Sequence, residues 1–143
     1  MAISVLYTAE GTAWGGREGR AASADNKVDV QLSVPKEMGG PGGEGTNPEE
    51  LFAVGYAACF HSALKLVAGK AKVNIAESAV TARVGIGSDD ADGGFGLTVE
   101  ILGELPGVPA DTARSLLEQA HAVCPYSKAT RNNIASSVTL IES

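Results

Sequence analysis

Apolar and polar residues alternate with a period of two in several stretches of this 143-residue chain. Such alternation is typical of a β-strand with one buried face. It predicts strands over residues 28–34, 80–86, 97–101 and 138–141, and a further strand over residues 3–7. Because each stretch has an apolar and a polar face, we expect antiparallel sheet, which can leave one face to solvent.

Residues 47–69 have the features of one long helix. Asn47 suits the N-cap, Pro48 suits the first helical position, where its missing N–H costs nothing, and Glu49 lies near the positive end of the helix dipole. Residues 51–60 are apolar on nearly every face. We therefore expect this helix to be enclosed by a sheet, or by a sheet and a partner subunit.

A second helix is predicted from about Pro109 to Cys124. Its apolar stripe has helical spacing and consists of Ala113, Leu116, Leu117, Ala120 and Cys124. Cys124 thus points inward at the helix end, directly before Pro125, which cannot continue the helix. Strands combined with two helices predict an α+β fold.

Composition and charge describe one soluble domain over residues 1–143, with 44% hydrophobic and 20% charged residues. The net charge of −6 and the 11 scattered basic residues oppose binding to nucleic acid or to anionic lipid. The first residues lack a basic targeting region, and the longest apolar run, residues 51–60, is about half of the ~20 residues that cross a bilayer. We expect a cytoplasmic protein with no membrane partner.

The segment from Gly40 to Gly45 matches the G-x-G-x-x-G pattern of dinucleotide-binding folds. The acidic residue that should follow about 20 positions later would fall inside the buried helix, and the strands alternate as antiparallel strands do. We interpret the segment as a mobile glycine-rich loop near the start of the long helix.

The chain has two cysteines, Cys59 in the long helix and Cys124 at the end of the second. Two inward-facing thiols on separate helices can meet, and a pair that meets can do redox chemistry. In a reducing compartment such a pair is more often transient and catalytic than a structural crosslink. The alternative is plain packing, because a buried cysteine among apolar neighbours is usually inert.

A reactive Cys59 needs a nearby cation that stabilises its thiolate. The helix dipole acts only over the first turn, and Cys59 lies about twelve residues further on. Three basic residues of the same helix have spacings that do not face Cys59: His61, Lys65 and Lys70. The remaining candidates are Arg17 and Arg20, in a glycine-rich segment whose backbone can approach a buried site closely.

Four motifs occur in a characteristic order: Gly15–Ala21, Pro35–Phe52, Gly55–Phe60 and Val123–Ser127. Together they closely resemble the organic hydroperoxide resistance (Ohr) proteins of the OsmC/Ohr family over essentially the whole chain. The resemblance implies an OsmC-like α+β fold, with an antiparallel sheet wrapped around a long buried central helix. It also implies an intertwined homodimer with active sites at the subunit interface.

The resemblance further implies a role for four residues. Cys59 corresponds to the peroxidatic cysteine, Cys124 to the resolving cysteine, Arg17 to the activating arginine and Glu49 to the carboxylate that holds this arginine. The implied activity is reduction of alkyl or fatty-acid hydroperoxides through a sulfenic acid and a Cys59–Cys124 disulfide. No bound cofactor is implied; the reductant is an external dithiol, expected to be a lipoylated protein.

The expected distance between Glu49 and Cys59 is large. Ten residues of straight helix place them about 15 Å apart along the axis. Arg17 must bridge much of this gap, or Gly55 and a loose first turn must bend the helix.

Three alternatives remain open. A metal-binding protein would use Cys59, His61, His121 and Cys124, although only His121 and Cys124 share a helix face. A dimeric ligand-binding protein would keep both thiols as core residues. An enzyme of the OsmC branch would have similar cysteines and prefer different peroxides.

Overall fold

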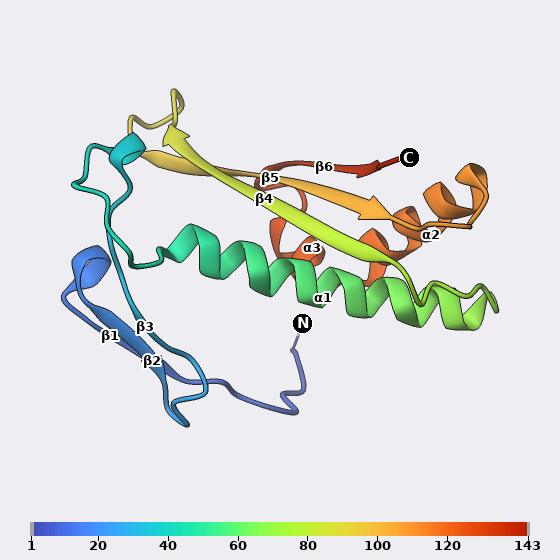
Figure 1. Ribbon diagram of the computed structural model, residues 1–143, viewed down its shortest axis with the longest axis horizontal. Helices are drawn as coiled ribbons and strands as arrows, with labels where there is room; N and C mark the ends of the chain where they lie inside the picture. Colours follow the sequence, from blue (N-terminus) through green and yellow to red (C-terminus); the bar gives the residue numbers. More distant parts are fainter. Residues whose placement is uncertain (1, 143) are drawn as a thin grey trace. The chain divides into compact units, whose positions relative to one another are not determined.

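The structure is a computed structural model that describes residues 2–142. The chain divides into two compact units, Met1–Pro48 and Glu49–Ser143, and each is described by itself. Each unit contains one three-stranded sheet (Figure 1). The single domain over residues 1–143 stays a prediction.

The first unit contains an antiparallel sheet in the order β1-β2-β3. Its strands are β1 (Gly11–Trp14), β2 (Arg20–Ser23) and β3 (Asp29–Gln31). Between β1 and β2 the chain turns through one short 3₁₀ segment, Gly16–Glu18, and a second follows β3 at Lys36–Met38. Gly15 and Gly16 have positive φ angles of 86° and 57°, a region that glycine enters without steric cost.

Two sequence predictions differ from the structure of this unit. The expected strand over residues 3–7 is wrong, because these residues pair with no strand and their side chains are exposed, Ile3 by 85% and Leu6 by 100%. An alternating pattern marks a possible strand, but only hydrogen bonding to a neighbour makes one. The strand expected over residues 28–34 is limited to β3, after which Leu32 forms an isolated parallel bridge to Thr46.

The second unit contains the sheet β4-β5-β6. Its strands are β4 (Ala79–Ser88), β5 (Phe95–Glu104) and β6 (Ala135–Leu140). β4 and β5 form a ten-residue antiparallel hairpin, as expected, whereas β6 runs parallel to β5. The sheet is therefore mixed, because the chain returns through two helices before it enters β6, and such a crossover joins parallel strands.

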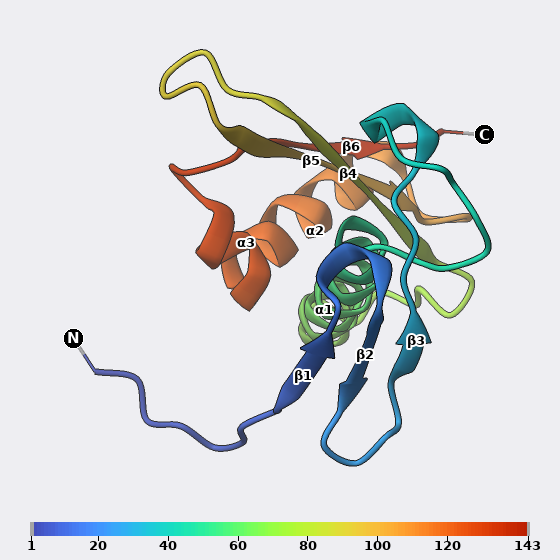
Figure 2. The same ribbon diagram turned by 90° about the vertical axis from the view of Figure 1, so that its left-hand side faces the viewer.

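Three helices cover one face of this sheet (Figures 1 and 2). They are α1 (Pro48–Lys70), α2 (Ala110–Val123) and α3 (Pro125–Thr130). The bounds of α1 and α2 confirm the two helices predicted from the sequence. The short helix α3 was not predicted, because its six residues give too little periodic pattern to detect.

The core of this unit lies between α1, α2 and β5. Its fully or nearly fully buried side chains include Tyr56, Phe60 and Leu64 of α1, Val99 and Ile101 of β5, and Leu116, Leu117 and Ala120 of α2. The other face of α1 is open in the single chain: Val54 is 66% exposed and Leu66 is 54% exposed. Contacts within the single chain thus cover only part of the apolar surface of α1.

By length and composition, α1 is apolar enough to span a membrane, and it is the only such helix among residues 2–142. This corrects the estimate from residues 51–60 alone, which measured an uninterrupted run rather than the whole helix. One face of α1 packs into the protein core with β5 and α2. Such packing is the arrangement of a core helix in a soluble domain.

Candidate active site

The two cysteines lie next to each other. Cys59 Sγ on α1 and Cys124 Sγ at the end of α2 are 3.6 Å apart, and both residues are free thiols. The expectation that two inward-facing thiols meet is confirmed. Their roles as peroxidatic and resolving cysteines stay a prediction.

The junction of α2 and α3 positions Cys124. The residue has an extended backbone, with φ −66° and ψ 123°, and ends α2 while it precedes α3. This conformation follows from Pro125, since the residue before a proline is driven out of the helical region. The Cys124 amide donates to the Ala120 carbonyl at 2.9 Å, and the Lys128 amide donates to the Cys124 carbonyl at 3.0 Å. Residues 124–127 are called the α2–α3 corner below.

The two thiols differ in their access to solvent. Cys59 is partly exposed, whereas Cys124 is completely buried. Burial raises the pKa of the Cys59 thiol, the backbone hydrogen bond from Tyr126 opposes this shift, and the adjacent Cys124 raises the pKa further. Within the second unit Cys59 thus has one backbone donor for its sulfur, and a reactive thiolate requires a further positive charge.

Three aromatic rings, one of them from the α2–α3 corner, pack against one another. The ring centroids of Phe52 and Tyr56 lie 5.8 Å apart, those of Phe52 and Tyr126 6.0 Å, and those of Tyr56 and Tyr126 5.7 Å. Gly55 lies beside this cluster: a Cβ atom there would be 3.7 Å from the Tyr126 ring. Tyr126 belongs to the same corner as Cys124, so this packing joins the corner to α1 through apolar surface.

A hydrogen-bond network joins the residues that flank the two cysteines, and no pattern in the sequence predicted it. Tyr56 Oη is 2.8 Å from Ser127 Oγ and 3.3 Å from Thr130 Oγ1, and His121 Nδ1 is 2.9 Å from the same Ser127 hydroxyl. Burial lowers the pKa of His121, and the charge of Arg131 lowers it further. In the sequence, Tyr56, His121 and Ser127 each lie three residues from a cysteine. This spacing predicts a hydrogen-bond network only when α1 is known to pack against α2 and α3.

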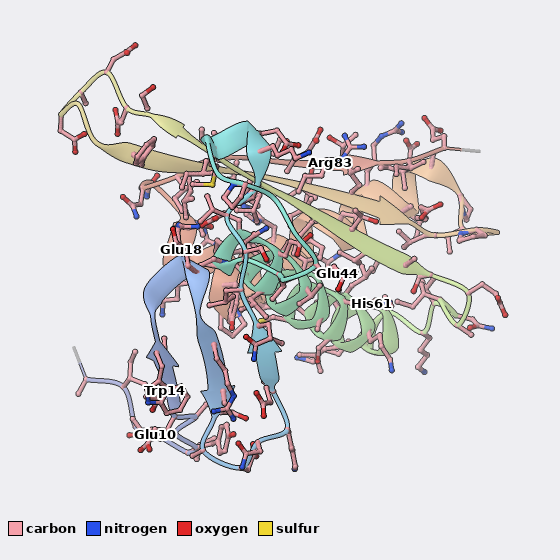
Figure 3. The ribbon with its side chains drawn as sticks, turned by 60° about the vertical axis from the view of Figure 1, so that its left-hand side comes forward. Glu10, Trp14, Glu18, Glu44, His61 and Arg83 are labelled. Carbon is pink, nitrogen blue, oxygen red and sulfur yellow. The ribbon has the colours of Figure 1, made fainter. Side chains whose placement is uncertain are left out.

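The metal-binding alternative finds no support among the described residues. His61 Nε2 lies 2.9 Å from Ser78 Oγ (Figure 3), and His121 is bonded to Ser127. Within residues 2–142, no three His, Cys, Asp or Glu side chains are grouped so as to hold a metal ion. The histidines therefore contact hydroxyl groups in separate places instead of joining the cysteines as ligands.

The two candidate arginines belong to the first unit. Arg20 makes two hydrogen bonds to the Asp29 carboxylate, at 2.8 and 2.9 Å, and its guanidinium lies 5.1 Å from the centroid of the Trp14 ring. Arg17 lies in the 3₁₀ segment Gly16–Glu18, while Glu49 lies in the first turn of α1. The contact of Arg17 with Cys59, and that of Glu49 with Arg17, stay predictions.

The second unit combines a mixed sheet, a long helix on one face of it, and a thiol of that helix 3.6 Å from a second thiol. These features together indicate a class of α+β proteins with a thiol pair. The chain belongs to the OsmC/Ohr family: the family model described as OsmC-like protein matches residues 40–139.

Its relatives identify a branch of this family. An organic hydroperoxide resistance protein of Xanthomonas axonopodis pv. citri is 53% identical over 137 residues, which cover 95% of either chain. The organic hydroperoxide resistance protein OhrA of Bacillus subtilis is 45% identical and covers 96% of this chain and 97% of its own. The crystal structure of an organic hydroperoxide resistance protein from Elizabethkingia anophelis superimposes with a TM-score of 0.91 at 47% identity, covering 99% of this chain and all of that chain.

The difference in burial leads to a prediction about thiol reactivity. In the reduced native protein, iodoacetamide should alkylate Cys59 at least about tenfold faster than Cys124, because a completely buried thiol is inaccessible. The rate at Cys59 should rise with pH up to the pKa of its thiol, since the thiolate is the nucleophile. Peptide mass spectrometry after timed quenching measures both sites, and unfolding in denaturant, which should equalise the rates, is the control. Faster labelling of Cys124 in the native state would contradict the arrangement.

Proposed function

We propose that this protein is a cysteine-based peroxidase that reduces organic hydroperoxides to alcohols. The observation that carries the proposal is the thiol pair, with the two sulfur atoms 3.6 Å apart on different helices. The relatives that are 53% and 45% identical are named organic hydroperoxide resistance proteins, which supports an oxidative stress response as the biological role and favours the Ohr branch over the OsmC branch.

In the first step the Cys59 thiolate attacks the distal oxygen of the hydroperoxide. The O–O bond breaks, the sulfur becomes a sulfenic acid, and the alkoxide leaves as an alcohol after protonation. Cys59 suits this step because it is the partly exposed member of the pair.

Activation of Cys59 is assigned to Arg17. Burial raises the pKa of the Cys59 thiol, so a permanently charged guanidinium is needed to favour the thiolate and to stabilise the departing alkoxide. Glu49 is proposed to orient this guanidinium through two parallel hydrogen bonds. Arg20, which binds the Asp29 carboxylate through two hydrogen bonds, is the second candidate.

In the second step the Cys124 thiol attacks the sulfenic acid. A Cys59–Cys124 disulfide forms, water leaves, and Cys59 is protected from further oxidation. An external dithiol then reduces the disulfide by exchange, and a lipoylated protein is the proposed reductant. The enzyme itself holds no cofactor in this cycle.

Phe52, which is partly exposed, and Tyr126, which is 40% exposed, support an organic substrate. Burying the tail of an alkyl or fatty-acid hydroperoxide against apolar side chains contributes about 0.8 kcal/mol per methylene, and hydrogen peroxide has no tail to bury. We place the reaction in the cytoplasm, where a lipoylated protein and a reduced thiol pair are compatible.

Replacement of each cysteine tests the two roles. Cys59→Ser should abolish turnover of an alkyl hydroperoxide, because a serine hydroxyl is a poor nucleophile at neutral pH. Cys124→Ser should permit one round, after which Cys59 progresses to sulfinic and sulfonic acid, seen as the gain of two and three oxygens. Intact-mass spectrometry checks both.

Wild-type protein is the matched control for these masses. It should lose two hydrogens as the disulfide forms and should resist the gain of oxygens. Reduced thiols that persist in the wild type after a stoichiometric amount of organic hydroperoxide would overturn the proposed function.

Replacement of each arginine tests the source of the activating charge. Arg17→Ala should raise the pKa of Cys59 and slow peroxide reduction by about two orders of magnitude or more, the usual effect of removing a charge-stabilising donor. Arg20→Ala, the matched control three residues away, should have a small effect. Stopped-flow measurement of Cys59 oxidation distinguishes them, and equal rates in the two variants would exclude the assignment to Arg17.

A substitution on the exposed apolar face of α1 tests the proposed homodimer. Val54 and Leu66 lie on this face in the single chain, and a second copy of the chain would cover them. We expect sedimentation to show a dimer at micromolar concentration and Leu66→Glu to weaken it, whereas the charge reversal Glu118→Lys, at an exposed position of α2, should not. A folded wild-type monomer at that concentration would rule out the dimer.

A further inference from the structure

Three polar side chains bracket the two cysteines at regular helical spacings. Tyr56 precedes Cys59 by three residues on α1, while His121 precedes Cys124 by three and Ser127 follows it by three. Residues three apart on a helix lie on neighbouring positions of one face. The hydrogen bonds that Ser127 Oγ shares with Tyr56 Oη, at 2.8 Å, and with His121 Nδ1, at 2.9 Å, therefore join α1, α2 and α3 one turn away from the sulfur atoms.

This network lies in the core rather than on the surface. Tyr56 and Ser127 are completely buried, and Thr130, which donates to the Ser127 carbonyl at 3.2 Å, is 3% exposed. Every buried side-chain nitrogen or oxygen in the described part of the chain has a partner. A buried polar group without its partner is costly, so each of these hydrogen bonds fixes the position of the group that it joins.

What the network fixes is the α2–α3 corner. Cys124 has an extended backbone, and Pro125 has no N–H with which to continue the hydrogen bonding of α2. The corner nevertheless brings two groups to Cys59: the Cys124 thiol, 3.6 Å away, and the Tyr126 backbone N–H. The hydrogen bond between His121 and Ser127 joins the residues before and after Cys124. The hydrogen bond between Ser127 and Tyr56 attaches the corner to α1.

We propose that Tyr56, His121 and Ser127 are positioning residues for the resolving step, holding the α2–α3 corner so that Cys124 captures the Cys59 sulfenic acid before a second peroxide does. The inference rests on the proposed peroxidase function. In this step the Cys59 S–O bond breaks, the S–S bond forms and the hydroxyl leaves with the Cys124 proton as water. Cys124 is oxidised and the Cys59 sulfenic acid is reduced.

The geometric demand of this step explains why positioning matters. The sulfur atoms must close from 3.6 Å to a bond of about 2.05 Å. A corner that moves by an ångström in the wrong direction loses this approach, while attack on peroxide by Cys59 does not require Cys124. The network thus controls the choice between disulfide and over-oxidation.

The test measures that choice directly. Ser127→Ala, Tyr56→Phe and His121→Ala are exposed to a pulse of tert-butyl hydroperoxide, and intact-mass spectrometry gives the ratio of disulfide to sulfinic acid. Tyr56→Phe keeps the aromatic ring, so it removes the hydroxyl with little change of packing. Loss of one ordinary hydrogen bond corresponds to a factor of roughly ten. His121→Ala removes one hydrogen bond of the network and the other two variants remove two each, so we expect the ratio to fall at least about tenfold in every variant.

Two further variants separate positioning from simple loss of stability. Ile101→Val, in the β5 part of the core, removes one buried methyl group and none of the hydrogen bonds of the network, so it should leave the ratio unchanged at a similar decrease in melting temperature. His121→Asn places an amide where Nδ1 lies and should restore much of the wild-type ratio. A further readout is the pH dependence of Cys59 alkylation, which should shift upward in Ser127→Ala, because the Tyr126 N–H is no longer held against the sulfur.

The outcomes distinguish this inference from the proposed function. If the wild type forms no disulfide, the peroxidase function itself is wrong and the inference falls with it. If the wild type forms the disulfide but the network variants keep its ratio, or if Ile101→Val changes the ratio as much as they do, the positioning role alone is wrong.

Discussion

The packing of the α2–α3 corner against α1 is the interaction on which the rest of the site depends. It places Cys124 Sγ 3.6 Å from Cys59 Sγ and directs the Tyr126 N–H toward the same sulfur. Pro125 makes the corner possible by ending α2, and the hydrogen bonds of Ser127 to Tyr56 and His121 hold it in place. Without this packing the two thiols would be unrelated core residues.

The electrostatics of the pair explain why a second part of the chain is needed for chemistry. Burial raises the pKa of Cys59, and one backbone donor offsets only part of this shift. The second unit therefore supplies a positioned but weakly ionised thiol. In the proposed function Arg17 contributes the missing positive charge.

The exposed face of α1 raises a similar question about assembly. One face of the helix is buried against α2 and β5, while Val54 and Leu66 are largely exposed in the single chain. An exposed apolar surface of this extent usually marks a contact with another protein, a membrane or a ligand. The proposed homodimer, which the family resemblance implies, would cover this face with a second copy of the chain.

Sequence alone determined the elements with strong, long periodic patterns. The helix from Pro48 to Lys70 and the β4–β5 hairpin followed from their apolar spacing, from the proline at the first helical position and from alternation. The helical positions of Cys59 and Cys124 predicted that the two thiols could meet, and the family resemblance then implied their roles. These features are local, so neighbouring residues in the chain are enough to specify them.

Tertiary structure decided what depends on contacts between distant residues. Residues 3–7 alternate like a strand but pair with none, and β6 runs parallel to β5 because two helices intervene. The network of Tyr56, His121 and Ser127 joins side chains up to 71 positions apart, so no local pattern could predict it. Spacing around each cysteine specified which faces were available, and only the packing of the helices brought those faces together.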